Sequence, residues 1–308
     1  MKPKLVVIVG PTASGKSDLA IAVAKKFGGE IISADSRQLY RGLEIGAAIE
    51  PGRWTKRGAK RVYAARGVAH HLTAFRSPAK PLTAAEYKKS ALSAIGDILK
   101  RGKLPILVGG TGLYVNAVVD NFSIPEVAPD PALRQRLEKL SSPALYARLQ
   151  KKDPIYAAKI PPQNRRYMIR ALEVIQTTGR PFSELQKKGE PLFTTLLLGV
   201  ERPRVELYRR IERRVDAMMK RGLLQEAKKL GRLYGWSNQV LSSLGHRQLG
   251  LALQGKIPLE EAVLMVKRDT RRYAKRQMGW FRRDARIIWL KSSQEAEKLV
   301  KRFLVNTE

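Results

Sequence analysis

The sequence contains no cysteine. Disulfide bridges, cysteine-based zinc sites and a thiol nucleophile are therefore excluded. Acidic residues are also scarce: Asp and Glu total 27 against 59 Lys and Arg, which leaves a formal net charge of +32. An excess of this size goes far beyond what solubility requires, and it is typical of a protein with a polyanionic partner.

Long hydrophobic runs are absent as well. No stretch approaches the length of a membrane span, and the first apolar run, Leu5 to Val9, predicts a strand rather than a secretory signal. We therefore expect a cytoplasmic protein with no membrane partner, and we expect a monomer. The hydrophobic share of 44% is sufficient for a real core, and a length of 308 residues favours two lobes.

The most specific motif directly follows that first strand. It matches the phosphate-loop pattern G-x-x-x-x-G-K-[ST] at every fixed position. Small residues in such a loop let the backbone N–H groups surround a diphosphate. Lys16 supplies a positive charge, and the Ser17 hydroxyl is a candidate magnesium ligand. The pattern predicts a diphosphate site but does not tell whether the diphosphate belongs to a nucleotide. The predicted diphosphate-binding residues are Gly10, Pro11, Thr12, Ala13, Ser14, Gly15, Lys16 and Ser17.

Strand and helix patterns alternate on both sides of a purely helical stretch. We predict strands at residues 4–9, 30–34, 104–108, 193–200 and 287–290, separated by helices. Such alternation predicts an α/β fold with a doubly wound parallel sheet, like that of P-loop NTPases. We assign residues 1–120 to the first part of this core, 121–190 to a helical insertion domain, and 191–308 to the second part of the core. We also expect a helix from Thr83 to Lys100, a long helix from Pro203 to Gly222, a helical pair at 235–255, and helices at 258–281 and after Ser292.

Two features near the predicted strand ends bear on the chemistry. Asp35 follows the second strand, where a carboxylate faces the phosphate site in this fold. It is a candidate magnesium ligand or general base, and a helix N-cap is the alternative. The strand at 104–108 ends in Gly109-Gly110-Thr111-Gly112, where phosphate-loop nucleotidases place a magnesium-binding aspartate. This absence weakens the interpretation as an ATPase or kinase without excluding it.

The motifs together resemble the tRNA dimethylallyltransferases, also called isopentenyl-tRNA transferases, over nearly the whole chain. The matching segments occur in order and comprise Gly10–Ser17, Ser33–Tyr40, Arg41–Gly46, His70-His71-Leu72, Val108–Tyr114, Arg166–Thr178 and Tyr273–Gln277. The resemblance implies transfer of a dimethylallyl group from dimethylallyl diphosphate to N6 of the adenosine at tRNA position 37, next to the anticodon. It implies that the loop holds this donor rather than ATP, that magnesium is needed, and that the α/β core carries a helical insertion.

The resemblance, taken with the residue types, assigns roles to individual residues. Asp35 would be the base, Thr111 would hold Asp35 or the adenine, and Lys16 with Arg210 or Arg214 would stabilise the departing diphosphate. Arg210 and Arg214 lie one turn apart on one helix face, and a solvated face is the alternative for each. Arg268 and the arginines after it form the densest basic cluster. The predicted tRNA-binding residues are Asp35, Ser36, Arg37, Gln38, Thr111, Gln163, Asn164, Arg165, Arg166, Arg271, Arg272, Lys275 and Arg276.

The chain departs from the family pattern at three places. Ala47 stands where the family usually has threonine, His246 stands where it has an aromatic residue, and Gly279 replaces a threonine. These changes concern the local RNA contacts rather than the chemistry. A small-molecule kinase and a non-enzymatic RNA-binding protein stay open as alternatives. ATP turnover would favour the first, and failure to bind any diphosphate would favour the second. We expect His70 and His71 to be structural rather than metal ligands.

Overall fold

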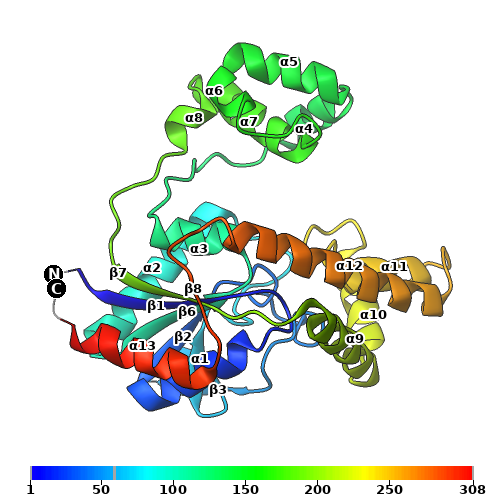
Figure 1. Ribbon diagram of the computed structural model, residues 1–308. Coiled ribbons are helices and arrows are strands. Elements are labelled where there is room, and N and C mark those ends of the chain that lie inside the picture. Colours follow the sequence, from blue (N-terminus) through cyan, green and yellow to red (C-terminus); the bar gives the residue numbers. More distant parts are fainter. Residues whose placement is uncertain (1, 58–59, 307–308) are drawn as a thin grey trace. The chain divides into compact units, whose positions relative to one another are not determined.

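The computed structural model describes residues 2–57 and 60–306. Within them, eight strands form one sheet in the order β3-β4-β5-β2-β6-β1-β7-β8 (Figure 1). Buried apolar residues fill β1 and β6, as expected for the centre of a sheet covered on both faces. The strands are β1 (Lys4–Val9), β2 (Gly29–Ser33), β3 (Arg53–Arg57), β4 (Lys60–Ala65), β5 (Val68–His71), β6 (Leu104–Gly109), β7 (Thr194–Gly199) and β8 (Ile288–Trp289).

Most strand pairs are parallel, which confirms the predicted α/β class. The pairs β2–β5, β2–β6, β1–β6, β1–β7 and β7–β8 are all parallel. The prediction missed β3, β4 and β5, and the pairs β3–β4 and β4–β5 are antiparallel. The edge strand β3 carries Arg53 and Lys56, and charged side chains of this kind hinder pairing with another chain.

Helices cover both faces of the sheet. Figure 1 shows α1 (Lys16–Phe27) and α13 (Ser293–Val305) on one face, with α2 (Ala84–Lys100) and α3 (Gly112–Val119) on the other. The core under α1 and α13 joins Val23 and Val300 to Ile8 and Ile106 of the sheet. Thr83 and Glu86 form the predicted capping box of α2. The sheet is therefore fixed from both sides, and its carboxyl edge is left for the site.

Four further helices lie beyond the carboxyl ends of the strands. They are α9 (Arg204–Lys220), α10 (Leu223–Tyr234), α11 (His246–Leu253) and α12 (Leu259–Phe281). Pro203 is the N-cap of α9, whose buried stripe is Leu207, Ile211 and Val215. The predicted helical pair at 235–255 is wrong. Only α11 is helical there, and α10 begins directly after Gly222, because a residue in the left-handed conformation ends one helix and caps the next.

The chain divides into two compact units, residues 1–115 with 192–308 and residues 116–191. The second unit begins within α3, slightly before the residue at which we placed the insertion. Its helices are α4 (Pro131–Glu138), α5 (Ser142–Lys152), α6 (Pro154–Ala157), α7 (Arg165–Thr178) and α8 (Phe182–Leu185). They pack around a core of their own that includes Leu145, Leu149 and Met168. Its two ends lie side by side, since Asn121 Nδ2 donates to Glu190 O at 3.0 Å and Ser123 N to Lys187 O at 2.8 Å.

Candidate diphosphate and nucleic-acid site

The phosphate loop connects β1 to α1 and is packed against β7. A Cβ at Gly10 would come within 2.4 Å of Val200 O, so only glycine allows this close approach. The Ser14 hydroxyl is buried, and among the described residues it has no hydrogen-bond partner. An unpaired buried hydroxyl costs free energy, so this group is available to donate a hydrogen bond to a bound ligand. The loop therefore fits an anion.

Two arginines hold the loop from outside. Arg210 Nε donates to Ala13 O at 2.8 Å, and Arg202 Nε donates to Ser14 O at 3.2 Å. Sequence reasoning named Arg210 but missed Arg202, which precedes α9 and matches no motif. Arg214 lines the neighbouring pocket. Burial, and then the nearby Arg210 charge, lower the pKa of Arg214, while the charges of Asp18 and Glu50 oppose this shift.

The Lys16 ammonium is bonded to the backbone of the phosphate loop. Its Nζ donates to Pro11 O at 3.3 Å. Desolvation by burial lowers the pKa of Lys16 to about 8, with Asp35 opposing this shift and Arg214 adding to it. The two predicted catalytic side chains, Lys16 and Asp35, are therefore near enough for their charges to interact. A bound diphosphate would favour the charged form of Lys16.

A buried glutamine joins the phosphate loop to the glycine turn. Gln277 Oε1 accepts from Thr12 N at 2.9 Å, and its Nε2 donates to Gly110 O at 2.9 Å. A Cβ at Gly110 would lie 2.1 Å from Gln277 Nε2, which explains why this turn is built from glycine. Helix α12 thus fixes both loops at the sheet edge. Gln277 belongs to the matching segment Tyr273–Gln277, but nothing in the sequence indicated this contact.

Asp35 follows β2 and caps a turn. Its Oδ1 accepts from Arg37 N at 2.9 Å and from Gln38 N at 3.4 Å, so the helix N-cap alternative was close, although a turn rather than a helix follows. No described residue is hydrogen-bonded to Oδ2. The Thr111 hydroxyl accepts from Ser36 N at 3.0 Å. Thr111 is thus bonded to the residue that follows Asp35, and its role in holding Asp35 or the adenine stays a prediction.

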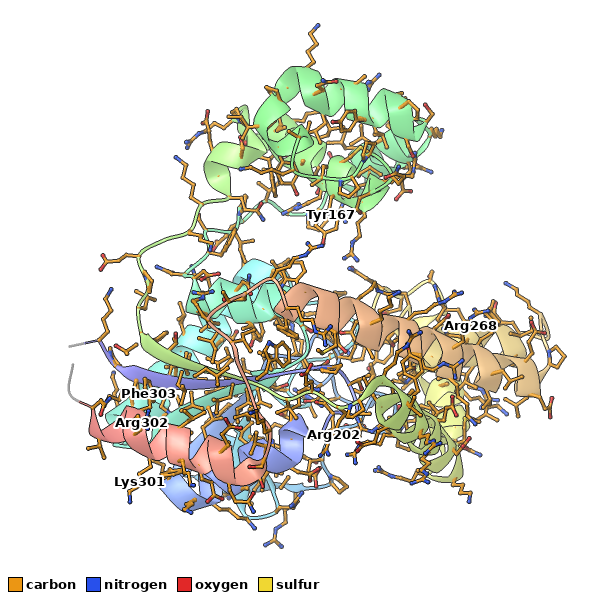
Figure 2. All side chains as sticks on the ribbon, viewed as in Figure 1. Tyr167, Arg202, Arg268, Lys301, Arg302 and Phe303 are labelled. Carbon is orange, nitrogen blue, oxygen red and sulfur yellow. The ribbon has the colours of Figure 1, made fainter. Side chains whose placement is uncertain are left out.

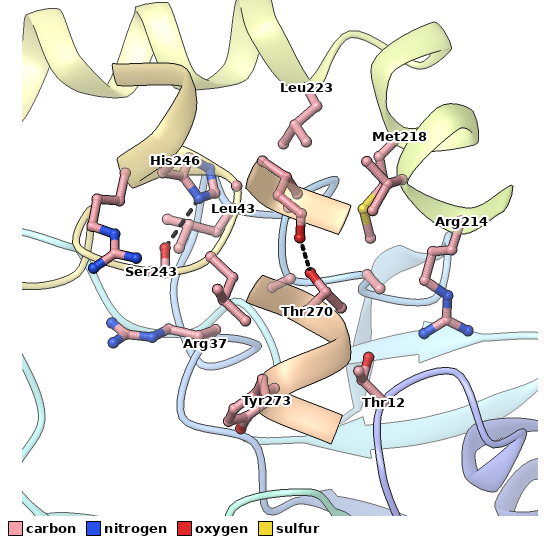
Figure 3. Close-up of a pocket in the computed structure, with 18 of the residues that line it drawn as sticks. Thr12, Arg37, Leu43, Arg214, Met218, Leu223, Ser243, His246, Thr270 and Tyr273 are labelled. Carbon is pink, nitrogen blue, oxygen red and sulfur yellow. Dashed lines mark hydrogen bonds between the residues drawn. The ribbon is translucent and has the colours of Figure 1, made fainter. Parts of the chain in front are cut away.

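These elements enclose a pocket of about 320 Å³ (Figure 3). Thr12, Asp35 and Arg214 lie on its wall, together with Tyr273 and Arg276 of α12. The rest of the wall includes polar side chains such as Arg37, Ser243 and His246. Its apolar part is formed by Leu43, Ile211, Val215, Met218, Leu223, Leu244 and Val266. A pocket that joins an anion site to an apolar chamber fits a ligand with a charged head and a hydrocarbon tail.

The predicted basic cluster on α12 is divided between two faces. Arg268, Arg272, Lys275 and Arg276 are exposed, and Figure 2 shows Arg268 at the surface of α12. Arg271 instead forms an ion pair with Glu212 of α9, and its guanidinium lies 5.9 Å from the centre of the Tyr208 ring. Arg271 therefore also helps to pack α12 against α9. The other four are exposed, and two of them, Arg268 and Arg272, also form ion pairs with Asp269.

The predicted contacts of the helical insertion lie at the start of α7. Gln163 and Arg166 are exposed. Asn164 is the N-cap residue of α7. Arg165 donates to Glu138 O at 2.9 Å and to Ser142 Oγ at 3.3 Å, which ties α7 to α4 and α5. Of the two arginines among these four residues, Arg166 therefore has the charge that is more available to a ligand.

The histidine pair sits away from this pocket. His71 Nε2 hydrogen-bonds with the buried Glu30 carboxylate at 2.7 Å, and Arg101 makes two further bonds to Glu30. Burial, and then the neighbouring His71, lower the pKa of His70 to about 4. Residues 2–57 and 60–306 contain no group of three or more His, Cys, Asp or Glu side chains that could hold a metal ion. The same ranges contain no helix long and apolar enough to cross a membrane.

The fold and the site together define a phosphate-loop α/β protein with a helical insertion. A family model described as IPP transferase matches residues 38–284. A tRNA dimethylallyltransferase from Carboxydothermus hydrogenoformans is 42% identical over 99% of this chain and 97% of its own, and one from Pelotomaculum thermopropionicum is 44% identical over 96% and 93%. The chain belongs to the IPP transferase family.

Solved structures of similar proteins agree with this assignment. The tRNA isopentenylpyrophosphate transferase of Bacillus halodurans is 38% identical, with a TM-score of 0.69 over 98% of this chain and 96% of its own. A eukaryotic dimethylallyltransferase captured acting on tRNA is 29% identical, with a TM-score of 0.80 over 99% of this chain and 80% of its own. The resemblance inferred from the motifs is thereby confirmed at the level of family and fold.

Proposed function

We propose that this protein is a tRNA dimethylallyltransferase. It transfers the dimethylallyl group from dimethylallyl diphosphate to N6 of the adenosine at position 37 of tRNA, and it releases diphosphate. The observation that carries this proposal is the pocket, in which the phosphate loop and Arg214 adjoin an apolar chamber and Asp35. The names of the relatives and the net charge of +32 support tRNA as the acceptor.

The diphosphate is the leaving group, and its stabilisation is the main task of the loop. The loop N–H groups, the Ser14 hydroxyl and Lys16 meet the oxygens, while Arg210 and Arg202 fix the loop itself. The donor set of this loop fits magnesium through the Ser17 hydroxyl, because Mg²⁺ usually takes few protein ligands together with phosphate oxygens. When bound, the ion would neutralise charge that develops on the leaving diphosphate.

The adenine amine is a weak nucleophile because its lone pair is delocalised into the ring. Asp35 accepts a hydrogen bond from that amine, orients it, and takes its proton during transfer. The carbon–oxygen bond of the donor breaks as the carbon–nitrogen bond forms, and the bond electrons leave with the diphosphate. The adenine cannot reach Asp35 while stacked, so it is extruded from the loop into the pocket. The exposed basic face of α12 and Arg166 would bind the surrounding phosphates.

A single assay tests this function. The protein is incubated with labelled dimethylallyl diphosphate, unmodified tRNA and magnesium, and the modified nucleoside is identified after digestion. We expect label on N6 of adenosine 37, with no hydrolysis of ATP. ATP hydrolysis without prenyl transfer would instead indicate the kinase class. Tight tRNA binding without binding of any diphosphate would indicate a non-enzymatic RNA-binding protein.

A further inference from the structure

A buried histidine at the start of α11 lies in the wall of the pocket. His246 Nε2 is 3.0 Å from Glu226 Oε1, and Ser243 Oγ is 3.1 Å from His246 Nδ1. Because an ionised carboxylate only accepts hydrogen bonds, Nε2 carries the proton and donates to Glu226. In the neutral ring, Nδ1 then accepts from the Ser243 hydroxyl. Every polar atom of the ring has a partner, so its orientation is fixed.

Glu226 uses the same carboxylate to hold a backbone segment. Its Oε2 accepts from Ile45 N at 2.7 Å, and its Oε1 accepts from Gly46 N at 2.8 Å. Charge-assisted hydrogen bonds of this length are among the stronger ones in proteins. The His246 ring also lies directly over Gly46. The pair formed by Glu226 and His246 therefore sets the position of the segment 43–48.

That segment in turn holds the turn that carries Asp35. Gln38 Nε2 donates to Ala47 O at 3.3 Å and to Ala48 O at 3.4 Å, and Gln38 Oε1 accepts from Ser33 Oγ at 3.1 Å. The backbone N–H of Gln38 donates to Asp35 Oδ1. A continuous series of hydrogen bonds thus runs from His246 through Glu226, the segment 43–48 and Gln38 to the proposed base.

We infer that His246 and Glu226 are positioning residues for Asp35. They act through the segment 43–48 and Gln38, and they keep the carboxylate where the adenine amine must arrive. This inference rests on the proposed function, since it concerns the base of that reaction. Correct placement of reacting groups matters because a displacement of about 1 Å can lower a rate by about 10²-fold.

The kinetic test uses His246→Phe, which keeps a planar ring but removes the donor to Glu226. We expect kcat for prenyl transfer to fall by about tenfold or more, with the KM for the donor and the Kd for tRNA within twofold of the wild type. His246→Gln keeps an N–H donor and should recover most of the rate. His70→Phe is the matched control, because this second buried histidine has no described partner at Nε2.

A double-mutant cycle identifies the route of the effect. In an Asp35→Ala background, His246→Phe should lower the remaining rate no further, because the group being positioned is gone. An undiminished effect in that background, an unchanged kcat, or a loss confined to KM would each overturn the inference. Glu226→Gln replaces one carboxylate oxygen by an amide nitrogen and should lower kcat in the same way. This variant replaces His246→Phe in the test if His246→Phe does not fold.

Hydrogen exchange gives a readout that does not depend on prenyl transfer. Peptides covering residues 43–50 should exchange faster in His246→Phe than in the wild type or in His70→Phe, since the amides of Ile45 and Gly46 are held by Glu226. Unchanged exchange would overturn the inference even if the enzyme is active. Absence of prenyl transfer by the wild type, with the expected change in exchange, would instead overturn the proposed function.

Discussion

The ring of His246 occupies the space that a side chain at residue 46 would need. A Cβ added to Gly46 would lie 2.3 Å from His246 Cε1 and 3.1 Å from Glu226 Oε1. We therefore expect Gly46→Ala to lower the free energy of unfolding by about 1–3 kcal/mol, as overpacking of a filled interior does. Thermal unfolding measures this, and the same change should cost less in a His246→Ala background. Equal costs in both backgrounds would show that the ring is not the obstacle.

Gly279 provides the opposite case. It lies on the exposed side of α12, and apart from its chain neighbours and the backbone of its own helix, no described atom comes within 4 Å of the Cβ position. Glycine within a helix costs about 1 kcal/mol relative to alanine. Gly279→Ala should therefore raise the free energy of unfolding by about 1 kcal/mol, measured by denaturant titration, and leave the KM for the donor unchanged. A stability below that of the wild type would contradict the open position.

The pKa of Lys16 makes donor binding depend on pH. Because burial lowers it to about 8, the free protein loses the ammonium charge as the pH rises through 8. The Kd for dimethylallyl diphosphate should then rise up to tenfold per pH unit above 8, and binding above pH 8 should take up a proton. Calorimetry in buffers of different ionisation enthalpy measures both. In Lys16→Ala, binding should be weak and the inflection near pH 8 should disappear, with tRNA binding nearly intact.

The same shift affects stability. Between about pH 8 and the ordinary lysine value of 10.5, the unfolded chain binds more protons at Lys16 than the folded chain does. This group alone therefore makes the free energy of unfolding rise with pH across that window. Lys16→Met should remove this contribution, which can be measured by urea unfolding at pH 7.5 and pH 10. A wild-type and a variant protein with the same pH slope would contradict it.

Removal of the proposed base should separate chemistry from binding. General-base catalysis contributes about 10²–10⁴-fold, so Asp35→Ala should lower the transfer rate by about that factor. The Kd for tRNA should change little, because Asp35 is a single residue among many contacts. Single-turnover assays at saturating tRNA give the rate, and filter binding gives the affinity. A variant that binds tRNA poorly but reacts at the normal rate when saturated would exclude this role.

The exposed face of α12 should behave in the opposite way. Replacement of Arg272 and Lys275 by alanine should weaken tRNA binding and leave the rate at saturating tRNA unchanged. The slope of log affinity against log salt should shrink by roughly 0.7–0.9 for each lost phosphate contact. The matched control changes Lys298 and Lys301, two exposed lysines of α13, which lies beside α1 on one face of the sheet (Figure 1), and should leave the slope as it was. Arg271→Ala should in addition lower stability, because it leaves Glu212 without this partner.

Local patterns predicted the parts of the fold that local forces determine. The capping box at Thr83, the apolar strand before the phosphate loop and the proline-initiated helix α9 each depend on neighbours within a few residues. The hairpin of β3 and β4 was missed because its charged residues Arg53, Lys56 and Arg61 give no apolar strand pattern. These strands are held by pairing, since β4 pairs with β5 and β5 pairs with β2.

In the site, too, the features set by local sequence were predicted and the long-range contacts were not. The loop and Asp35 were found because strand ends and phosphate loops have fixed spacings in sequence. The contacts of Gln277, Arg202 and Glu226 join residues more than 150 positions apart. The hydrophobic periodicity of a sequence cannot indicate such a contact. These residues reach the loops because α9, α10 and α12 pack against the sheet edge.

The helical unit is inserted between β6 and β7. Its two ends are joined in a stem by the hydrogen-bonded pairs Asn121–Glu190 and Ser123–Lys187. A segment whose ends are already joined adds no constraint to the strands on either side. A short turn in its place would preserve the strand order, since β6 and β7 both pair with β1. The strand order of the core therefore does not depend on what lies between the two ends of this stem.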